Sequence, residues 1–212
     1  MKKRFTILFG AFCALMILIS MPGKAVGQAS VGTTLWSEDF SGYENNTVPS
    51  GEITNSHDGT TVYGGVTLTY ACVNGSSTTQ TYTSGGPNSN SNLLISKNGG
   101  SFTISGISTG EASELTVSYE KSGSGTVTIS SSTTGVTISG STITTGGAST
   151  ISITFTNSTG SNLRFDDAVI TVKTAGGQQL TPSNLAITDA PVALSFDLTN
   201  NSTAQTVSYT TS

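Results

Sequence analysis

The strongest constraint on the fold is an alternation of apolar and polar residues that recurs along most of the chain. The segments "VTLTYACV" (66–73), "ELTVSYEK" (114–121) and "TISITFT" (150–156) each carry an apolar side chain at every second position. Because successive side chains of a β-strand point to opposite faces, this period predicts strands with one buried face. Trp36 and Phe40 share strand parity and are expected to pack inward. Almost no segment has a helical period, so the sequence predicts an all-β protein.

Turn-forming dipeptides separate the alternating runs. Asn-Gly pairs at 74–75 and 98–99 each lie between two such runs, and Asn-Gly favours the positive φ angles of a tight β-hairpin. A Ser-Gly pair at 139–140 separates two further short runs. About ten short strands with hairpin-length connections are expected before residue 175. We therefore expect an antiparallel β-sandwich, with one face of each sheet in the core.

The character of the sequence changes after "TAGGQQ" (174–179). Residues 180–212 contain about three strand-like runs, whereas an immunoglobulin-like sandwich needs about seven strands. We expect residues 33–174 to form the main sandwich domain and residues 180–212 to form an incomplete Ig-like module. On this interpretation, further C-terminal domains belong to the protein but are missing from this chain.

The N-terminus has the organisation of a secretory signal peptide. Basic residues at positions 2–4 precede an apolar stretch at 5–20, and small residues offer cleavage after Gly27 or Ala29. The apolar stretch is shorter than the roughly 20 residues that span a bilayer, and its retention as a membrane anchor is the alternative. We expect residues 1–29 to be a signal peptide, with no stable membrane insertion after cleavage. The expected location is therefore secreted or at the cell surface.

The charge that remains after such cleavage argues against a nucleic-acid partner. Four of the eight basic residues lie in the N-terminal segment, so four basic residues remain against twelve acidic ones, a net charge of −8. A surface of this sign repels phosphate backbones. Cys72 is then the one cysteine left, so it cannot form an internal disulfide. A small buried side chain is its expected role.

Two segments at the ends of the main domain resemble a known family. "LWSEDFSGY" (35–43) and "NLRFDDAVITV" (162–172) are similar to the opening and closing strands of jelly-roll, galactose-binding-like modules of the "choice-of-anchor" type in secreted Bacteroidetes proteins. The resemblance covers about residues 33–174 and implies that the two strands lie near each other. Residues from Leu180 onward resemble the start of a BACON-like or other Ig-like module. Such modules are implied to be spacers or carbohydrate-associated units attached to enzymes or adhesins, and the resemblance brings no catalytic residues.

The adjacent carboxylates Asp166 and Asp167 lie where the apolar pattern changes register. Apolar positions are odd-numbered before this pair and even-numbered after it, which predicts a β-bulge or a crossover between sheets. If the resemblance holds, Asp39 or Glu38 lies near them. Asp39, Asp166 and Asp167 are the candidate ligands of a structural Ca²⁺. The alternative is a bulge in which Asp166 pairs with Arg164 or accepts backbone N–H groups. The sequence leaves both interpretations open.

Aromatic and amide side chains are the remaining candidates for ligand binding. Tyr63 and Tyr82 lie beside Gly-Gly segments on polar strands, where an exposed ring is suited to stack on a sugar. Asn88, Asn90 and Asn92, in "GGPNSNSN" (85–92), offer amide hydrogen bonds from a loop. The alternative is a flexible polar loop without a ligand.

The sequence predicts no catalytic site. "GISTG" (106–110) matches G-x-S-x-G by spelling, but strand rather than helix is expected after it. His57 is the only histidine, which excludes a multi-histidine zinc site. The preferred function is non-catalytic recognition, with glycans or other extracellular ligands as partners. The alternatives are a structural spacer or adhesin segment, and an ancillary N-terminal region of a larger secreted enzyme whose catalytic domain is not in this chain.

Overall fold

The computed structural model describes residues 28–88 and 90–176. The first strand, β1, begins at Thr34 and the last, β13, ends at Thr174. The compact unit to which they belong ends at Gly177. Most of the predicted signal peptide (residues 1–27) and the predicted Ig-like module lie outside the described residues. Within the described ranges, no helix is long and apolar enough to cross a membrane.

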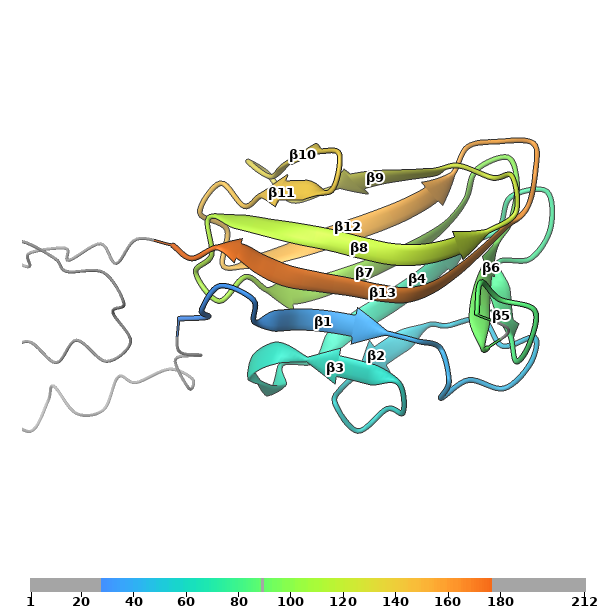
Figure 1. The fold of residues 1–212 in the computed structure, drawn as a ribbon, viewed down its shortest axis with the longest axis horizontal. Helices are drawn as coiled ribbons and strands as arrows, with labels where there is room; N and C mark the ends of the chain where they lie inside the picture. The colour runs from blue at the N-terminus through green and yellow to red at the C-terminus, as the bar shows by residue number, and fades with distance from the viewer. Residues whose placement is uncertain (1–27, 89, 177–212) are drawn as a thin grey trace, which may run out of the picture. The chain divides into compact units, whose positions relative to one another are not determined.

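Two antiparallel sheets form the sandwich, which confirms the predicted fold class (Figure 1). The first sheet contains β1 (Thr34–Glu38), β3 (Thr60–Val62), β5 (Gln80–Tyr82), β6 (Asn92–Ile95), β8 (Glu114–Ser122), β10 (Thr137–Ser139), β11 (Thr142–Thr144) and β13 (Leu163–Thr174). The second contains β2 (Gly51–Ile53), β4 (Leu68–Val73), β7 (Gly100–Ser108), β9 (Val127–Ser131) and β12 (Thr150–Asn157). A 3-10 turn, Tyr63–Gly65, follows β3.

The strand order places the longest strand, β13, near the middle of the first sheet. That sheet has the order β10-β11-β8-β13-β1-β3, with β6 also paired to β13 and β5 paired to β6. The second sheet has the order β2-β4-β7-β12-β9. Neighbours in space are mostly not neighbours in sequence, so the chain crosses repeatedly between the two sheets, as in a jelly roll.

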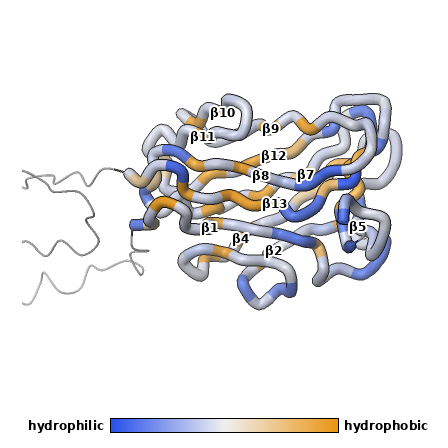
Figure 2. The backbone as a smooth tube through the Cα atoms, viewed as in Figure 1, coloured by the Kyte–Doolittle hydropathy of each residue, from blue (hydrophilic) through white to orange (hydrophobic). Residues whose placement is uncertain are grey.

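Apolar side chains from both sheets fill the space between them. Trp36 and Phe40 are fully buried, so the prediction that both pack inward is confirmed. Phe155 of the second sheet lies 4.8 Å from Phe165 of the first, measured between ring centroids. Figure 2 shows apolar residues recurring at intervals along β8, β12 and β13, the pattern of strands with one buried face.

The prediction of tight hairpins at the two Asn-Gly pairs is wrong, because the strands on either side lie in different sheets. After the pair at 74–75, the chain leaves β4 in the second sheet for β5 in the first. The pair at 98–99 has the predicted positive φ angles of 61° and 97°, but it connects β6 to β7 across the sandwich. The Ser-Gly pair at 139–140 does join a hairpin, formed by β10 and β11.

The change of register predicted at Asp166-Asp167 is a β-bulge in β13. Asp166 pairs with Glu120 of β8, and Val169 pairs with Ser118, so two residues of β13 oppose one residue of β8. Asp167 has a φ of 46°, in the left-handed region. The apolar side chains before and after the bulge are all buried except Val169, which is half-buried. The prediction of a bulge that shifts the buried face is therefore confirmed.

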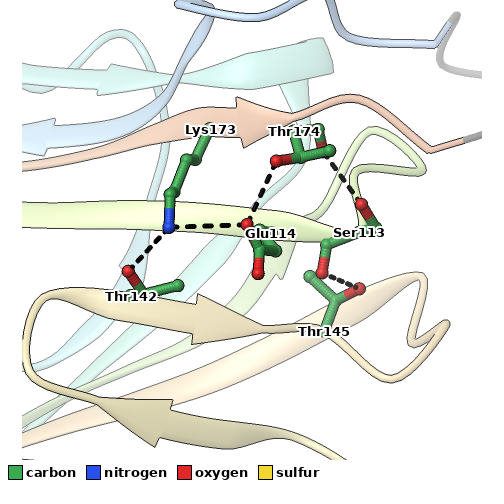
Figure 3. Close-up of polar contacts among 6 residues, drawn as sticks. All are labelled: Ser113, Glu114, Thr142, Thr145, Lys173 and Thr174. Carbon is green, nitrogen blue, oxygen red and sulfur yellow. Dashed lines mark hydrogen bonds and ion pairs between the residues drawn. The ribbon is translucent and has the colours of Figure 1, made fainter.

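The C-terminal end of β13 is joined to its neighbours by exposed polar contacts (Figure 3). Lys173 Nζ lies 3.4 Å from Glu114 Oε2 and donates to Thr142 Oγ1 at 3.0 Å, so it links β13 with β8 and β11. Thr174 Oγ1 donates to the same Glu114 carboxylate at 3.1 Å. Because Lys173 and Glu114 are 44% and 37% exposed, solvent limits the ion pair to about 1 kcal/mol or less.

The environment of Cys72 fits its expected role as a small packed side chain. The residue is half-buried and packs against the core. Burial raises the pKa of its thiol from 9.0 to about 12. Since the thiolate is the reactive form, little of it is present at neutral pH.

Candidate functional site

A pocket lies at one end of the first sheet, beside a break in the strand order next to β13. On the edge opposite β8, β13 pairs with β6 through Leu163–Phe165 and with β1 from Ala168 onward. Strand β1 therefore ends, and β6 begins, on either side of the bulge. The residues that follow β1 and precede β6 are brought next to Asp166 and Asp167.

The pocket is open, has a volume of about 300 Å³ and is lined only by polar residues. Its lining consists of three carboxylates, three hydroxyls and one amide, contributed by Asp39, Ser41, Thr83, Asn90, Ser91, Asp166 and Asp167. All three predicted metal ligands and one of the predicted glycan-binding amides therefore lie in one place. Donor groups of these kinds bind either a hard cation or the hydroxyl groups of a polyol.

Asp166 is the most deeply buried carboxylate of the pocket, at 1% exposure. Its Oδ1 accepts the backbone N–H of Asp167 at 2.9 Å, whereas its Oδ2 is buried without a hydrogen-bond partner. Burial is the main cause that raises the pKa of Asp166 from 3.8 to about 6. The charges of Asp167, Asp39 and Glu38 act in the same direction. This carboxylate is therefore poorly compensated by the protein itself.

The sequence left two structural roles open for Asp166, acceptance of a backbone N–H and pairing with Arg164. Acceptance of a backbone N–H is confirmed, since Asp167 supplies one. The pairing with Arg164 is wrong, because Arg164 Nη1 donates instead to Asn92 Oδ1 at 3.0 Å. The Arg164 guanidinium carbon also lies 4.1 Å from the centroid of the Tyr82 ring, a cation–π contact that covers one face of the ring.

Asp39 is fixed at the pocket by the turn that follows β1. Its Oδ1 accepts the backbone N–H of Ser41 at 2.8 Å. Gly59 lies against this turn with a φ of 77°, and a Cβ there would collide with the Asp39 carboxylate and with Ser41 Oγ. Glycine at position 59 therefore lets two loops meet behind Asp39.

The loop between β5 and β6 supplies another part of the pocket wall. Asn88 Nδ2 donates to Asp167 Oδ2 at 3.0 Å. The backbone carbonyl of Asn90 accepts from Asn92 Nδ2, also at 3.0 Å, which fixes the loop where β6 begins. Of the three predicted glycan-binding amides, Asn88 thus contacts a pocket carboxylate, Asn90 lines the pocket and Asn92 is fully buried.

The two predicted aromatic platforms do not lie together. Tyr82 ends β5 and immediately precedes Thr83, which lines the pocket. Tyr63 lies in the 3-10 turn close to Gly110, near the end of the sheet where β13 finishes. Neither tyrosine belongs to the pocket lining, but Tyr82 adjoins it in sequence whereas Tyr63 lies at the other end of the sheet.

A buried carboxylate at the end of β1 supports the pocket from the core. Glu38 Oε2 accepts hydrogen bonds from Thr60 Oγ1 at 2.7 Å and from the Tyr70 hydroxyl at 2.9 Å. Its Oε1 accepts the backbone N–H of Phe40 at 2.8 Å. Burial raises the pKa of Glu38, and these hydrogen bonds oppose that rise. The network holds β1 in place one residue before Asp39.

His57 and Ser108, the serine of "GISTG", make separate contacts. The His57 ring centroid lies 4.4 Å from that of Tyr43, and His57 Nδ1 is 3.0 Å from the carbonyl oxygen of Asp58. Ser108 Oγ accepts the backbone N–H of Gly110 at 3.4 Å. None of these contacts joins the two side chains.

Sequence reasoning missed the hydroxyl groups of the pocket, those of Ser41, Thr83 and Ser91. Serine and threonine are so abundant in this chain that no local pattern distinguishes these three. Their positions become informative once the break between β1 and β6 is known. Among the described residues, no three His, Cys, Asp or Glu side chains are arranged to hold a metal ion. The three predicted metal ligands therefore share a pocket without converging on one point.

The left-handed backbone of Asp167 leads to a first prediction. Replacing Asp167 with valine is expected to lower the free energy of unfolding by roughly 1–2 kcal/mol or more, because a β-branched residue is strained at positive φ. Replacing it with glycine is expected to change that free energy by less than about 1 kcal/mol, since glycine adopts this conformation freely. Urea unfolding of both variants measures the difference. Equal stabilities would show that the bulge does not impose this backbone angle.

Comparisons of the chain with models of protein families, with curated proteins and with solved structures give no match.

Proposed function

We propose that the protein is an exported, non-catalytic recognition module that binds carbohydrate in the pocket beside the β13 bulge. The observation that carries this proposal is the all-polar lining of the pocket, which combines carboxylates, hydroxyls and an amide. A sugar presents neighbouring hydroxyl groups that both donate and accept hydrogen bonds. Carboxylates accept such bonds, and amides and hydroxyls do both. A volume of about 300 Å³ lies at the small end of ligand pockets and suits a single sugar unit.

The surroundings of the pocket support the same function. Tyr82 is half-buried and immediately precedes Thr83 of the pocket, and an aromatic ring near polar groups can bind the apolar face of a sugar. The loops that line the pocket project from a rigid sandwich, a common way to present a binding site. The resemblance to modules of secreted proteins adds only an analogy at the level of the fold.

A glycan array probed with the purified full chain tests the proposal. We expect binding to a restricted group of glycans, and we expect Asn90→Ala and Tyr82→Ala to abolish it. Tyr63→Ala is the matched control and is expected to keep the binding, because Tyr63 lies away from the pocket. Circular dichroism confirms that each variant is folded. A folded chain that binds no glycan would favour the spacer or adhesin interpretation, and loss of binding in Tyr63→Ala alone would place the site elsewhere.

Export leads to a second prediction, about the mature N-terminus. Ala29 is 2% exposed, and its backbone N–H donates to the Gly110 carbonyl at 2.9 Å. The Gln28 side chain donates to the carbonyl of Gly176. Cleavage after Ala29 would remove both contacts, whereas cleavage after Gly27 keeps them. We therefore expect the secreted protein to begin at Gln28, which intact-mass measurement of the exported product checks. A product that begins at Ser30 would contradict this expectation.

A further inference from the structure

Among the residues that the structure describes, the carboxylates of the pocket have no cationic partner. Asp39 and Asp167 accept hydrogen bonds from neutral groups, a backbone N–H and the Asn88 amide. Arg164 lies close in sequence but binds Asn92 and the Tyr82 ring instead. Within the described residues, the one ion pair is Lys173–Glu114, near the C-terminal end of β13. Three like charges therefore share one pocket without compensation.

The unpartnered oxygen of Asp166 is an independent indication of a missing ligand. Asp166 is 1% exposed, and its Oδ2 has no hydrogen-bond partner, although the residue lines the pocket. A buried acceptor without a partner costs free energy, more so when it is charged. Buried polar atoms are nearly always satisfied in native proteins, so each exception calls for an explanation such as an ion. The bulge brings this carboxylate to the pocket, but no group of the described protein neutralises it.

The donor atoms around Asp166 indicate the class of ligand. The lining offers carboxylate, hydroxyl and amide oxygens, and it contains no sulfur or imidazole. Calcium prefers six to eight oxygen ligands in flexible geometry, including carboxylates, carbonyls and water. Magnesium demands a tighter octahedral arrangement and keeps more of its water, and zinc prefers nitrogen and sulfur ligands. An open pocket lined by oxygen donors suits calcium better than either of the other metals.

We propose that the pocket binds a calcium ion, with Asp166 as its central ligand and with Asp39 and Asp167 as the other carboxylate ligands. The pocket hydroxyls, the Asn90 amide and water complete the oxygen shell. The ion compensates the buried Asp166 oxygen and draws together the turn after β1, the loop before β6 and the β13 bulge. This inference does not depend on a sugar ligand, because calcium alone is sufficient to test it.

Calorimetric titration of the calcium-stripped full chain with CaCl₂ tests the proposal, together with thermal unfolding in CaCl₂ and in EDTA. We expect one calcium ion per chain and a higher Tm in calcium, because a ligand that binds only the folded state stabilises it. An equal concentration of MgCl₂ is expected to have a much smaller effect. Asp166→Asn is expected to weaken calcium binding by more than the roughly 10–100-fold that loss of an outer-shell partner costs. Glu52→Gln, which removes an exposed charge on β2 in the other sheet, is expected to bind calcium as the wild type does.

The stability of Asp166→Asn in EDTA separates a ligand role from a purely structural one. If Asp166 is an uncompensated ligand, the amide variant is expected to be at least as stable as the wild-type chain without metal, because a buried charge has been removed. A lower Tm of this variant in EDTA would overturn the proposal, and so would a calcium response that persists in it or is absent from the wild type. Calcium binding without any signal on the glycan array would contradict the proposed carbohydrate function alone.

Discussion

Replacing Phe155 with alanine is expected to lower the free energy of unfolding by about 3–5 kcal/mol, because it leaves a cavity in the middle of the sandwich. Phe155 projects from β12 of the second sheet and is fully buried. Its ring lies near those of Phe165, Tyr119 and Trp36, all of which belong to the first sheet. The substitution therefore removes contacts that hold the two sheets together. A domain of this size is stable by only about 5–15 kcal/mol in total.

Urea unfolding followed by tryptophan fluorescence measures this loss, because Trp36 is the only tryptophan and is buried against the same cluster. Val73→Ala is the control, since Val73 is 56% exposed and its truncation is expected to cost less than about 0.5 kcal/mol. Similar losses in the two variants would mean that the aromatic cluster does not form the core.

Replacing Glu38 with alanine is expected to lower the free energy of unfolding by about 2–4 kcal/mol. The substitution leaves three buried donors without their acceptor, and each such donor costs about 1–3 kcal/mol. These donors are Thr60 Oγ1, the Tyr70 hydroxyl and the Phe40 backbone N–H. The substitution also removes a buried carboxylate, which offsets part of this destabilisation. Because Glu38 precedes Asp39, the pocket is expected to lose calcium affinity as well.

Glu38→Gln is the matched variant, and it also tests the charge of this side chain. The amide keeps an acceptor for the buried donors, so a smaller loss than that of Glu38→Ala is expected. Burial raises the pKa of Glu38 above 4.5, so the folded protein binds this proton more readily than the unfolded chain does. Its contribution to stability is therefore complete below about pH 4.5 and is lost as the pH rises through the folded-state pKa. The pKa of Asp166 is also raised, from 3.8 to about 6, so its contribution to stability changes with pH in the same direction.

In EDTA, the wild-type chain is consequently expected to lose more stability between about pH 4.5 and pH 7 than Glu38→Gln does. Urea unfolding at several pH values measures how the free energy of unfolding of each chain changes with pH. The same pH dependence in both chains would show that Glu38 does not titrate differently in the folded and unfolded states. Equal stabilities of Glu38→Ala and Glu38→Gln would show that the hydrogen-bond network contributes little.

The strands of this domain were predictable from the sequence, whereas much of their pairing was not. The alternation in "TISITFT" indicates which side chains of β12 face the core, because that property is local. Pairing depends on contacts between residues distant in sequence. The Asn-Gly pair at 98–99 shows the difference: it has the predicted φ angles, yet it connects two sheets rather than two paired strands.

The candidate site was partly predictable for a similar reason. The change of parity around Asp166 predicts the bulge, since each half of β13 has its own local pattern. The nearness of Asp39 followed only from a resemblance to a family. The contributions of Ser41, Thr83 and Ser91 depend on where β1 ends beside β6, and no local pattern encodes that. The unpartnered oxygen of Asp166 likewise becomes visible only in three dimensions.

We propose that the pocket beside the β13 bulge is the binding site of this domain. Backbone amide NMR spectra, recorded while calcium and then an array-selected sugar are added, test this proposal. We expect shift changes to concentrate at the pocket residues, namely Asp39, Ser41, Thr83, Asn90, Ser91, Asp166 and Asp167. Changes that instead surround Tyr63 at the other end of the sheet, or spectra that neither addition alters, would contradict it.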